Sequence, residues 1–449
     1  MQALGPLKKS ILMILPVVLV SACVSGCLRI RADDLYKLPQ ASEDYLKLQE
    51  SINNILNLGA EYSPPASGPN RQSVQLRDLN GDGSNEVIAF FNTPHDSKLS
   101  IYIFRMVDGD YMVADIIEGV GAAFESVRYV DLDGDGVLEI IVGRQEGAAL
   151  KHMSIYSVKD YPAVQLASRE YSEINVFDIN SDGNGDVILF RLLSQEAGMI
   201  AEAFSLMQDG EVVSEEARLS AGIDRILRVM NGKLSDGVPA MFVDSEGRFE
   251  DGGLITDILA FKDGVFTNIS MEGPDGISKE TVRGRFNSTD INKDGVIEVP
   301  MPRLLKAQSE TPYYAVDWYA FNILGKSNLA LTTYHNINDE WFLILPLDWR
   351  GKVSIRREDI VMGERTVIFS FIAGPDGPYE DFLKIYKISG NMREERAQLA
   401  GRVPLISEGA AVYAFELLAQ PNSFGLTFSE KLIKDNFRLL YSEWLSGIS

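Results

Sequence analysis

One nine-residue stretch of the sequence carries several oxygen ligands at short, regular spacing. Asp131, Asp133 and Asp135 occupy its positions 1, 3 and 5, Gly136 occupies position 6, and Glu139 occupies position 9. Hard cations such as Ca²⁺ prefer carboxylate and carbonyl oxygens, and glycine at position 6 allows the sharp turn that brings such ligands together. The stretch therefore predicts a calcium-binding loop, with the backbone carbonyl of position 7 as a further ligand.

The segments on both sides of this loop read as β-strands. An EF-hand would have helices there and a bidentate Glu at position 12, which is Val142 in this chain. Apolar runs at 125–130 and 138–144 flank the loop instead. We therefore expect a strand–loop–strand unit.

The same pattern occurs three more times. The copies begin at residues 78, 131, 178 and 290, so the last gap is about twice the others. A degenerate copy lies at 226–243, with Gly232, Leu234 and Ala240 at positions 1, 3 and 9. The remaining predicted metal ligands are Asp78, Asn80, Asp82 and Glu86; Asp178, Asn180, Asp182 and Asp186; and Asp290, Asn292, Asp294 and Glu298. The chain thus has five repeats of about fifty residues, four of which can hold metal.

Ordinary turns are the alternative explanation for these loops, because Asp, Asn and Gly also dominate turns that bind nothing. Four copies that each keep an acid at position 9 favour metal binding. Flexible carboxylates with a carbonyl suit Ca²⁺ better than Mg²⁺. We expect a structural role for the ion, since several carboxylates cannot be packed together without compensation.

Each repeat reads as four short strands, which is typical of a β-propeller blade. An apolar strand, the motif D-x-[DN]-x-D-G-x-x-[DE] and a second apolar strand recur, and this pattern resembles the FG-GAP/VCBS repeats also found in integrin α-chain propellers. The resemblance implies a mainly β fold in which residues 72–336 form a propeller with Asp-rich calcium loops. Five repeats predict five blades, or six if flanking segments complete another.

The N-terminus reads as an export signal. Lys8 and Lys9 precede an apolar stretch, Ser10–Val20, that is short for a membrane span. The following Val-Ser-Gly-Cys27 resembles the lipobox of bacterial lipoproteins, and Cys23 ends a similar sequence. The resemblance implies that residues 1–27 are a signal peptide and lipobox. Lipidation of Cys27, or alternatively Cys23, would anchor the protein on the extracytoplasmic face of the cell membrane. An uncleaved membrane anchor is the other interpretation.

Residues 28–71 are expected to form a tether and one amphipathic helix at Ser42–Leu58. Ser42 is a plausible N-cap, and Gly59 is a plausible residue to end the helix.

The net charge of −22 argues against a nucleic-acid partner, because phosphate binding requires a basic face. The only two cysteines lie in the predicted lipoboxes, so we expect no disulfide in the folded part.

The fifty-residue period ends near Asn336, and residues 337–449 are predicted to form a separate α+β domain. Its strand-like runs suggest an antiparallel sheet, and Ser429–Leu445 reads as a terminal helix with a capping box at Thr427-x-x-Glu430. An apolar strand that ends in Pro-x-x-Trp, followed by such a sheet and helix, resembles the PsbP-like domains of bacterial exported proteins.

The sequence contains no Gly-x-Ser-x-Gly, His-Glu-x-x-His or phosphate-loop motif, and its three histidines share no pattern. Aromatic pairs such as Tyr313-Tyr314 and Trp318-Tyr319 could line a ligand surface, although alternating aromatic strands are more typical of a blade core. We expect a non-enzymatic, calcium-stabilised binding or scaffold module at the cell surface, with a protein or carbohydrate ligand. A purely structural envelope protein and a hydrolase of cell-surface polymers are the alternatives.

Overall fold

The computed structural model describes residues 43–440, except 94–97, 148–149, 193–197, 208–209, 248–252, 272–280, 282–285, 307–310, 360, 375–376, 400 and 421–422. The predicted signal peptide and lipoboxes, with Cys23 and Cys27, lie outside the described residues. Within those residues, no helix has both the length and the apolar character required to cross a membrane.

The described strands form six antiparallel sheets. The first sheet contains β1 (Glu61–Tyr62), β2 (Val74–Arg77), β3 (Glu86–Thr93), β4 (Lys98–Val107) and β5 (Asp110–Val120). The second contains β6 (Ala123–Val130), β7 (Glu139–Gln145), β8 (Lys151–Ser157) and β9 (Val164–Tyr171). The third contains β10 (Glu173–Phe177), β11 (Asp186–Leu192), β12 (Met199–Leu206) and β13 (Val212–Arg218).

The remaining sheets continue this order along the chain. The fourth contains β14 (Ile223–Lys233), β15 (Pro239–Gly247), β16 (Leu254–Lys262) and β17 (Val265–Asn268). The fifth contains β18 (Glu298–Leu304), β19 (Tyr314–Phe321), β20 (Ser327–Asn336), β21 (Trp341–Leu345) and β27 (Phe437–Leu439). The sixth contains β22 (Val353–Glu358), β23 (Glu364–Ile372), β24 (Tyr379–Ser389), β25 (Arg402–Glu408) and β26 (Ala411–Leu417).

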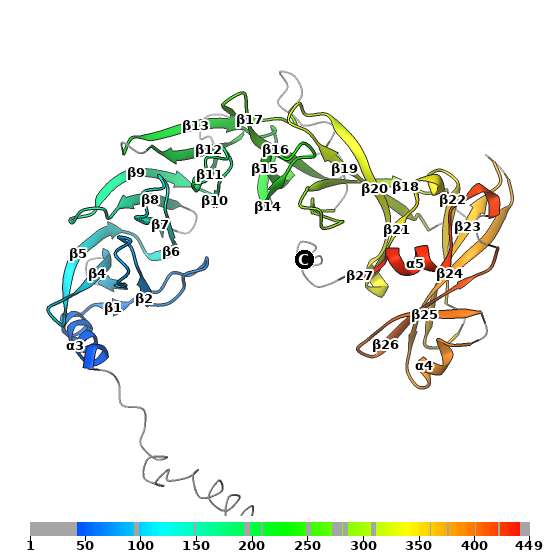
Figure 1. Cartoon of the computed structure of the whole chain (residues 1–449), viewed down its shortest axis with the longest axis horizontal. Coiled ribbons are helices and arrows are strands. Elements are labelled where there is room, and N and C mark those ends of the chain that lie inside the picture. The colour runs from blue at the N-terminus through cyan, green and yellow to red at the C-terminus, as the bar shows by residue number, and fades with distance from the viewer. Residues whose placement is uncertain are drawn as a thin grey trace, which may run out of the picture.

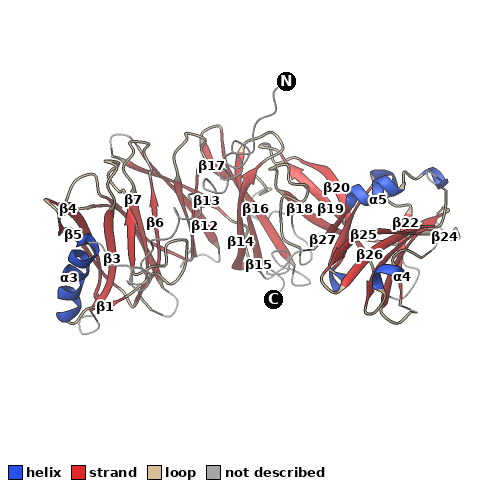
Figure 2. Cartoon of the chain, turned by 60° about the horizontal axis from the view of Figure 1, so that its bottom comes forward, coloured by secondary structure: helices blue, strands red, loops and turns tan. Residues whose placement is uncertain are grey.

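The sheets follow one another along an open arc, with β6, β10 and β14 toward its concave side and β5, β9 and β13 toward the outside (Figure 1). A second view shows them side by side in a row, with α3 (Glu43–Asn57) at one end (Figure 2). We expected a ring of blades. The described residues have the blade-like sheets, but these sheets form an open row.

Alternation of side chains along the central strands explains why the sheets stack. In β7, Ile140 and Val142 join a core with the first sheet, whereas Ile141 joins a core with the third. Successive residues of a strand point to opposite faces, and a strand covered on both faces reads as a continuous apolar run. The row therefore has one hydrophobic core for each pair of neighbouring sheets.

Helix α3 covers the outer face of the first sheet, as its apolar stripe predicts. Ile52 and Ile55 pack with Val87, Ala89 and Phe91. Gly59 follows the helix with a φ of 95°, which glycine adopts at little cost. The predicted N-cap, Ser42, lies outside the described residues.

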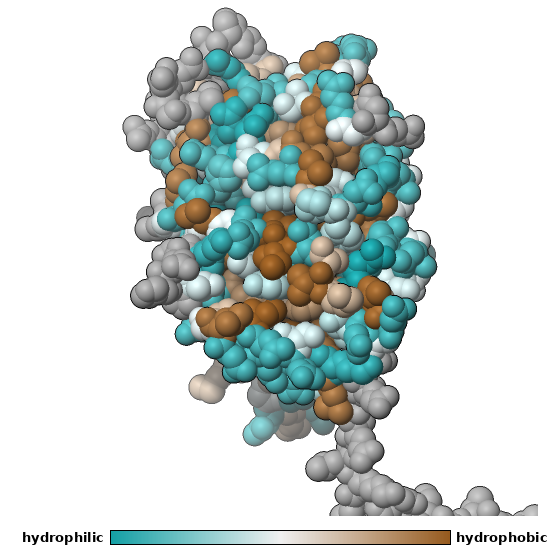
Figure 3. Space-filling model, turned by 90° about the vertical axis from the view of Figure 1, so that its left-hand side faces the viewer, coloured by the Kyte–Doolittle hydropathy of each residue, from teal (hydrophilic) through white to brown (hydrophobic). Residues whose placement is uncertain are grey.

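The end of the row seen in Figure 3 carries hydrophobic side chains along its middle with hydrophilic ones around them.

The predicted domain boundary between residues 336 and 337 falls inside the fifth sheet. Strand β21 pairs with β20, from Thr332 opposite Leu345 to Asn336 opposite Trp341. A short 3₁₀ turn, η3 (Ile337–Asp339), joins the two strands. The change of sheet comes after β21, at the 3₁₀ helix η4 (Leu347–Trp349), because an edge strand of the fifth sheet was available for Trp341–Leu345.

The predicted terminal helix, Ser429–Leu445, is wrong over Phe437–Leu439, which form a strand, and residues 441–445 lie outside the described residues. Helix α5 spans only Glu430–Asn436, and β27 then pairs with β21 as the outer strand of the fifth sheet. The N-cap is Ser429, whose Oγ accepts a hydrogen bond from the Leu432 N–H (3.2 Å), so the predicted capping box at Thr427 is also wrong. Phe437 and Leu439 are buried as alternate residues of a strand.

The sixth sheet is antiparallel, in the order β22-β23-β24-β26-β25. Helix α4 (Arg393–Arg396) lies against β24 and β26, and a 3₁₀ segment, η5 (Ser423–Gly425), precedes α5. This arrangement agrees with the expected antiparallel sheet. The resemblance to PsbP-like domains stays a prediction.

Candidate metal site

The four acidic loops occupy equivalent places in their sheets. Residues 78–86 join β2 to β3, residues 131–139 join β6 to β7, residues 178–186 join β10 to β11, and residues 290–298 lead into β18. In each case the position 9 acid is the first residue of the second strand and is buried: Glu86, Glu139, Asp186 and Glu298. The predicted ligands of each loop therefore lie on one turn that ends in a buried acid.

Successive loops also touch. The Leu138 N–H donates to the Leu79 carbonyl (2.8 Å), which joins the first loop to the second. A Cβ on Gly81 would lie 2.8 Å from the Gly136 carbonyl oxygen, and one on Gly134 would lie 2.7 Å from Asn184 Oδ1 in the third loop. Position 4 of the first two loops thus has no room for a side chain without movement of a neighbour.

A ladder of backbone hydrogen bonds holds the acidic side chains in each loop. The second loop contains Gly136 N–H to Asp131 Oδ2 (3.0 Å), Asp135 N–H to Asp133 Oδ1 (3.2 Å), Val137 N–H to Asp135 Oδ1 (2.8 Å) and Leu132 N–H to Glu139 Oε2 (3.1 Å). Equivalent bonds in the other three loops measure 2.8 to 3.1 Å. These bonds orient the side chains.

The second loop has the most concentrated negative charge. Oxygens of Asp131, Asp133 and Glu139 lie within 4.8 Å of one another, the only such group of three acids found among the described residues. Glu139 is 2% exposed. Burial, followed by the charges of Asp133, Asp135 and Asp131, raises its pKa to about 7. An all-oxygen donor set of this kind fits a hard cation.

In the other three loops an Asn at position 3 supplies neutral hydrogen-bond donors. Asn180 Nδ2 donates to Asp182 Oδ2 (3.0 Å) and to Asp186 Oδ1 (3.1 Å). Asn80 donates in the same way to Asp82 (3.0 Å), and Asn292 donates to Asp294 (2.8 Å). The amide N–H groups thus compensate part of the acidic charge, which Asp133 in the second loop cannot do.

Two carboxylate oxygens in the Asn-containing loops still lack a hydrogen bond. Asp78 Oδ1 and Asp178 Oδ1 are both buried, and neither accepts a bond. A buried acceptor without a partner costs about 1–3 kcal/mol, more when charged. Because a cation would compensate these position 1 oxygens, the first and third loops also fit a metal ion.

The position 9 acids differ in their surroundings. Burial raises the pKa of Glu298 to about 7 and also raises the pKa values of Glu86 and Asp186. The Ser205 hydroxyl donates a hydrogen bond to Asp186, and the Arg105 side chain lies 3.6 Å from Glu86. Glu86 and Asp186 are therefore partly compensated by contacts from outside their own loops.

A nearby lysine was missed by the sequence reasoning. Lys159 Nζ lies 2.7 Å from Asp135 Oδ2 in the second loop and lowers the pKa of Asp135. Lys159 follows β8. Because it lies far from the loop in sequence, the contact could not be predicted from the sequence.

The fourth repeat has a tight turn instead of an acidic loop. The Leu234 N–H donates to the Val238 carbonyl (2.9 Å), and Asp236 accepts a hydrogen bond from the Ile323 N–H (2.9 Å).

A family model described as an FG-GAP-like repeat matches residues 59–142. The match covers the first sheet, part of the second and the first two acidic loops. A search of curated proteins finds no match. The chain therefore carries an FG-GAP-like repeat in a mainly β fold.

Proposed function

We propose that the protein is an extracytoplasmic lipoprotein in which calcium, bound in the acidic loops, stabilises a row of propeller-type blades. The row serves as a non-enzymatic binding or scaffold module at the cell surface. The convergence of Asp131, Asp133 and Glu139 within 4.8 Å carries this proposal. Such carboxylates repel one another unless a cation lies between them, and calcium is the hard cation that extracellular modules bind at about 10⁻⁴–10⁻³ M.

The ion would stabilise the folded loops and would take no part in a reaction. The first three loops each join two strands of a blade, and the last leads into β18. The bond between Leu138 and Leu79 joins the first loop to the second. Asp131, Asp133, Asp135 and Glu139 would hold the ion in the second loop, and the corresponding residues would hold it in the first, third and last loops. Bound calcium would favour the folded loop, because the unfolded chain offers no preformed site.

Thermal melting of the full chain in detergent, with calcium and with a chelator, tests this proposal. We expect calcium to raise the melting temperature in a concentration-dependent way. Magnesium at the same concentration is the control, and it should raise the melting temperature less. Equal curves with calcium and chelator would show that the loops are ordinary turns.

Anchoring is tested separately, since it rests on the sequence alone. Mass spectrometry of the membrane fraction should find a diacylglyceryl group on Cys27, or on Cys23 if the first lipobox is used. A protein that retains Met1 would contradict this part of the proposal and leave the metal loops unaffected.

Binding is favoured over hydrolysis by one observation. The cavity between the fifth and sixth sheets has no Asp or Glu among its described lining residues, whereas a glycosidase needs a pair of carboxyl groups beside its substrate. The buried acids of the loops each accept a backbone hydrogen bond from within their own loop. The protein would thus bind its partner without transforming it.

A further inference from the structure

A cavity of about 460 Å³ lies between the fifth and sixth sheets, far along the chain from the FG-GAP-like repeat. Its lining comes from β19, β20, the turn η3, β22 and β23. Ligand sites commonly have volumes of about 300–1,000 Å³ and occur where two structural units meet. The size and place of this cavity are therefore those of a small-molecule site.

Aromatic rings form much of its wall. Tyr334 is 5% exposed and packs edge-on against Trp341 and Phe369, each with a centroid distance of 5.7 Å. Tyr314 is 46% exposed. His335 stacks on Phe342 with centroids 5.1 Å apart, and burial lowers its pKa to about 3, which keeps the ring neutral. The wall thus combines rings fixed by packing with one accessible tyrosine.

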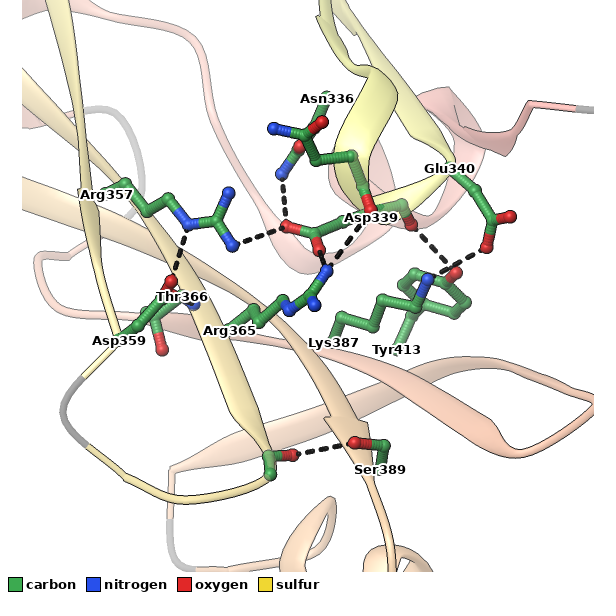
Figure 4. A network of polar contacts seen from close by, with 12 residues as sticks. Asn336, Asp339, Glu340, Arg357, Asp359, Arg365, Thr366, Lys387, Ser389 and Tyr413 are labelled. Carbon is green, nitrogen blue, oxygen red and sulfur yellow. Dashed lines mark hydrogen bonds and ion pairs between the residues drawn. The ribbon is translucent and has the colours of Figure 1, made fainter. Parts of the chain in front are cut away.

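The positive charge of Arg357 in the lining is balanced by nearby aspartates. Arg357 Nε lies 2.7 Å from Asp359 Oδ2, and Arg357 Nη2 lies 3.8 Å from Asp339 Oδ2. Asp339 is also bound by Arg365 (2.8 Å) and by the amide of Asn336 (2.8 Å), as Figure 4 shows. Two arginines thus face two aspartates. Arg357 is the only charged residue among the described residues that line the cavity.

We propose that this cavity binds a neutral saccharide of one or two sugar units. The inference rests on the proposed binding function and names the ligand class. Sugar hydroxyls can both donate and accept hydrogen bonds, as can the tyrosine hydroxyls and the amide of Asn338. The C–H faces of a sugar ring suit a tyrosine surface such as Tyr314. A charged ligand would find no unpaired opposite charge on the described lining, and burying such a charge is costly.

The test titrates the full chain in detergent with maltose, cellobiose and N,N′-diacetylchitobiose. Saturation-transfer NMR detects binding, and the fluorescence of Trp341, which packs on Tyr334, reports it from the protein side. We expect saturable binding of at least one sugar, with a Kd of about 1 mM or below. Tyr314→Ala and Asn338→Ala should each weaken it about tenfold, a change typical of losing one good contact.

Tyr379→Ala is the matched control, because Tyr379 is similarly exposed on β24 but does not line the cavity. It should bind as the wild type does. No saturable binding of any of the three sugars, or equal binding by all variants, would overturn the inference. Tighter binding of adenosine than of every sugar would also overturn it. The calcium-dependent melting shift is independent, so its persistence without sugar binding would reject this site alone.

Discussion

The second and third acidic loops have the same hydrogen-bonded backbone and differ at one decisive side chain. Position 3 is Asp133 in the second loop and Asn180 in the third. Asn180 donates to Asp182 and Asp186, whereas Asp133 adds another carboxylate to a group that already contains Asp131 and Glu139. The amide of Asn180 thus compensates part of the acidic charge of the third loop. We therefore expect the two loops to differ in how much they depend on calcium.

The largest expected effect on calcium-dependent stability comes from removing the carboxylate at position 1 of a loop. Asp131→Ala should reduce the calcium-dependent stabilisation more than Asp78→Ala, because the second loop carries four carboxylates and the first carries three with an Asn. At free calcium a hundredfold above Kd, one site contributes about 2.7 kcal/mol to the free energy of unfolding. Melting curves at several calcium concentrations measure the difference. Identical calcium shifts in the two variants would contradict the ranking.

Exchanging position 3 tests the comparison directly. Asp133→Asn should raise the melting temperature in chelator and lower the calcium shift, since one charge leaves the group and an amide donor enters. The expected gain without calcium is about 1 kcal/mol, the energy of roughly one pKa unit. Asn180→Asp should do the opposite in the third loop. A loss of stability in chelator for Asp133→Asn would mean that its charge is not the destabilising feature.

Lys159 offers a smaller effect. Its ammonium group lies 2.7 Å from Asp135 Oδ2 and competes with an ion for that oxygen. Lys159→Ala should therefore lower the Kd for calcium, measured by isothermal titration, and the improvement should shrink at high salt. Lys98→Ala is the control, because Lys98 pairs with Glu118 in the first sheet. An unchanged Kd in Lys159→Ala would show that this ion pair does not compete.

The smallest effect is expected in the fourth repeat. Asp236 accepts a hydrogen bond from Ile323 in a tight turn that lacks the other ligands. Asp236→Ala should cost about 1 kcal/mol through that bond and leave the calcium shift as it is. Differential scanning calorimetry with and without calcium measures both values. A reduced calcium shift would mean that this turn also takes part in binding.

Local features of the fold could be predicted from the sequence. The loops, their position between two strands and the helix before the first sheet depend on residues close together in the chain. Glycine at position 6 and apolar residues at alternate strand positions are enough to indicate them. Trp318 was expected in a blade core, and it is fully buried there.

Long-range pairing could not be predicted. The spacing of Ile433, Phe437 and Leu440 suits a helix, but β21 offers a free edge, and Phe437–Leu439 pairs with it. The open row likewise depends on how far each sheet turns relative to the next, which no local pattern specifies. The cavity combines residues from two sheets, so Tyr314 and Arg357 gave no joint signal in the sequence.

The residue type at position 4 of each loop differs according to whether another acidic loop follows it. All four residues there adopt a positive φ: Gly81 (71°), Gly134 (75°), Ser181 (64°) and Lys293 (65°). Glycine stands only in the two loops that are followed by another acidic loop, where a Cβ would collide with it. The left-handed conformation costs Ser181 and Lys293 roughly 1–2 kcal/mol each, and both residues are exposed. Glycine at position 4 thus marks the two loops that are crowded by the acidic loop after them.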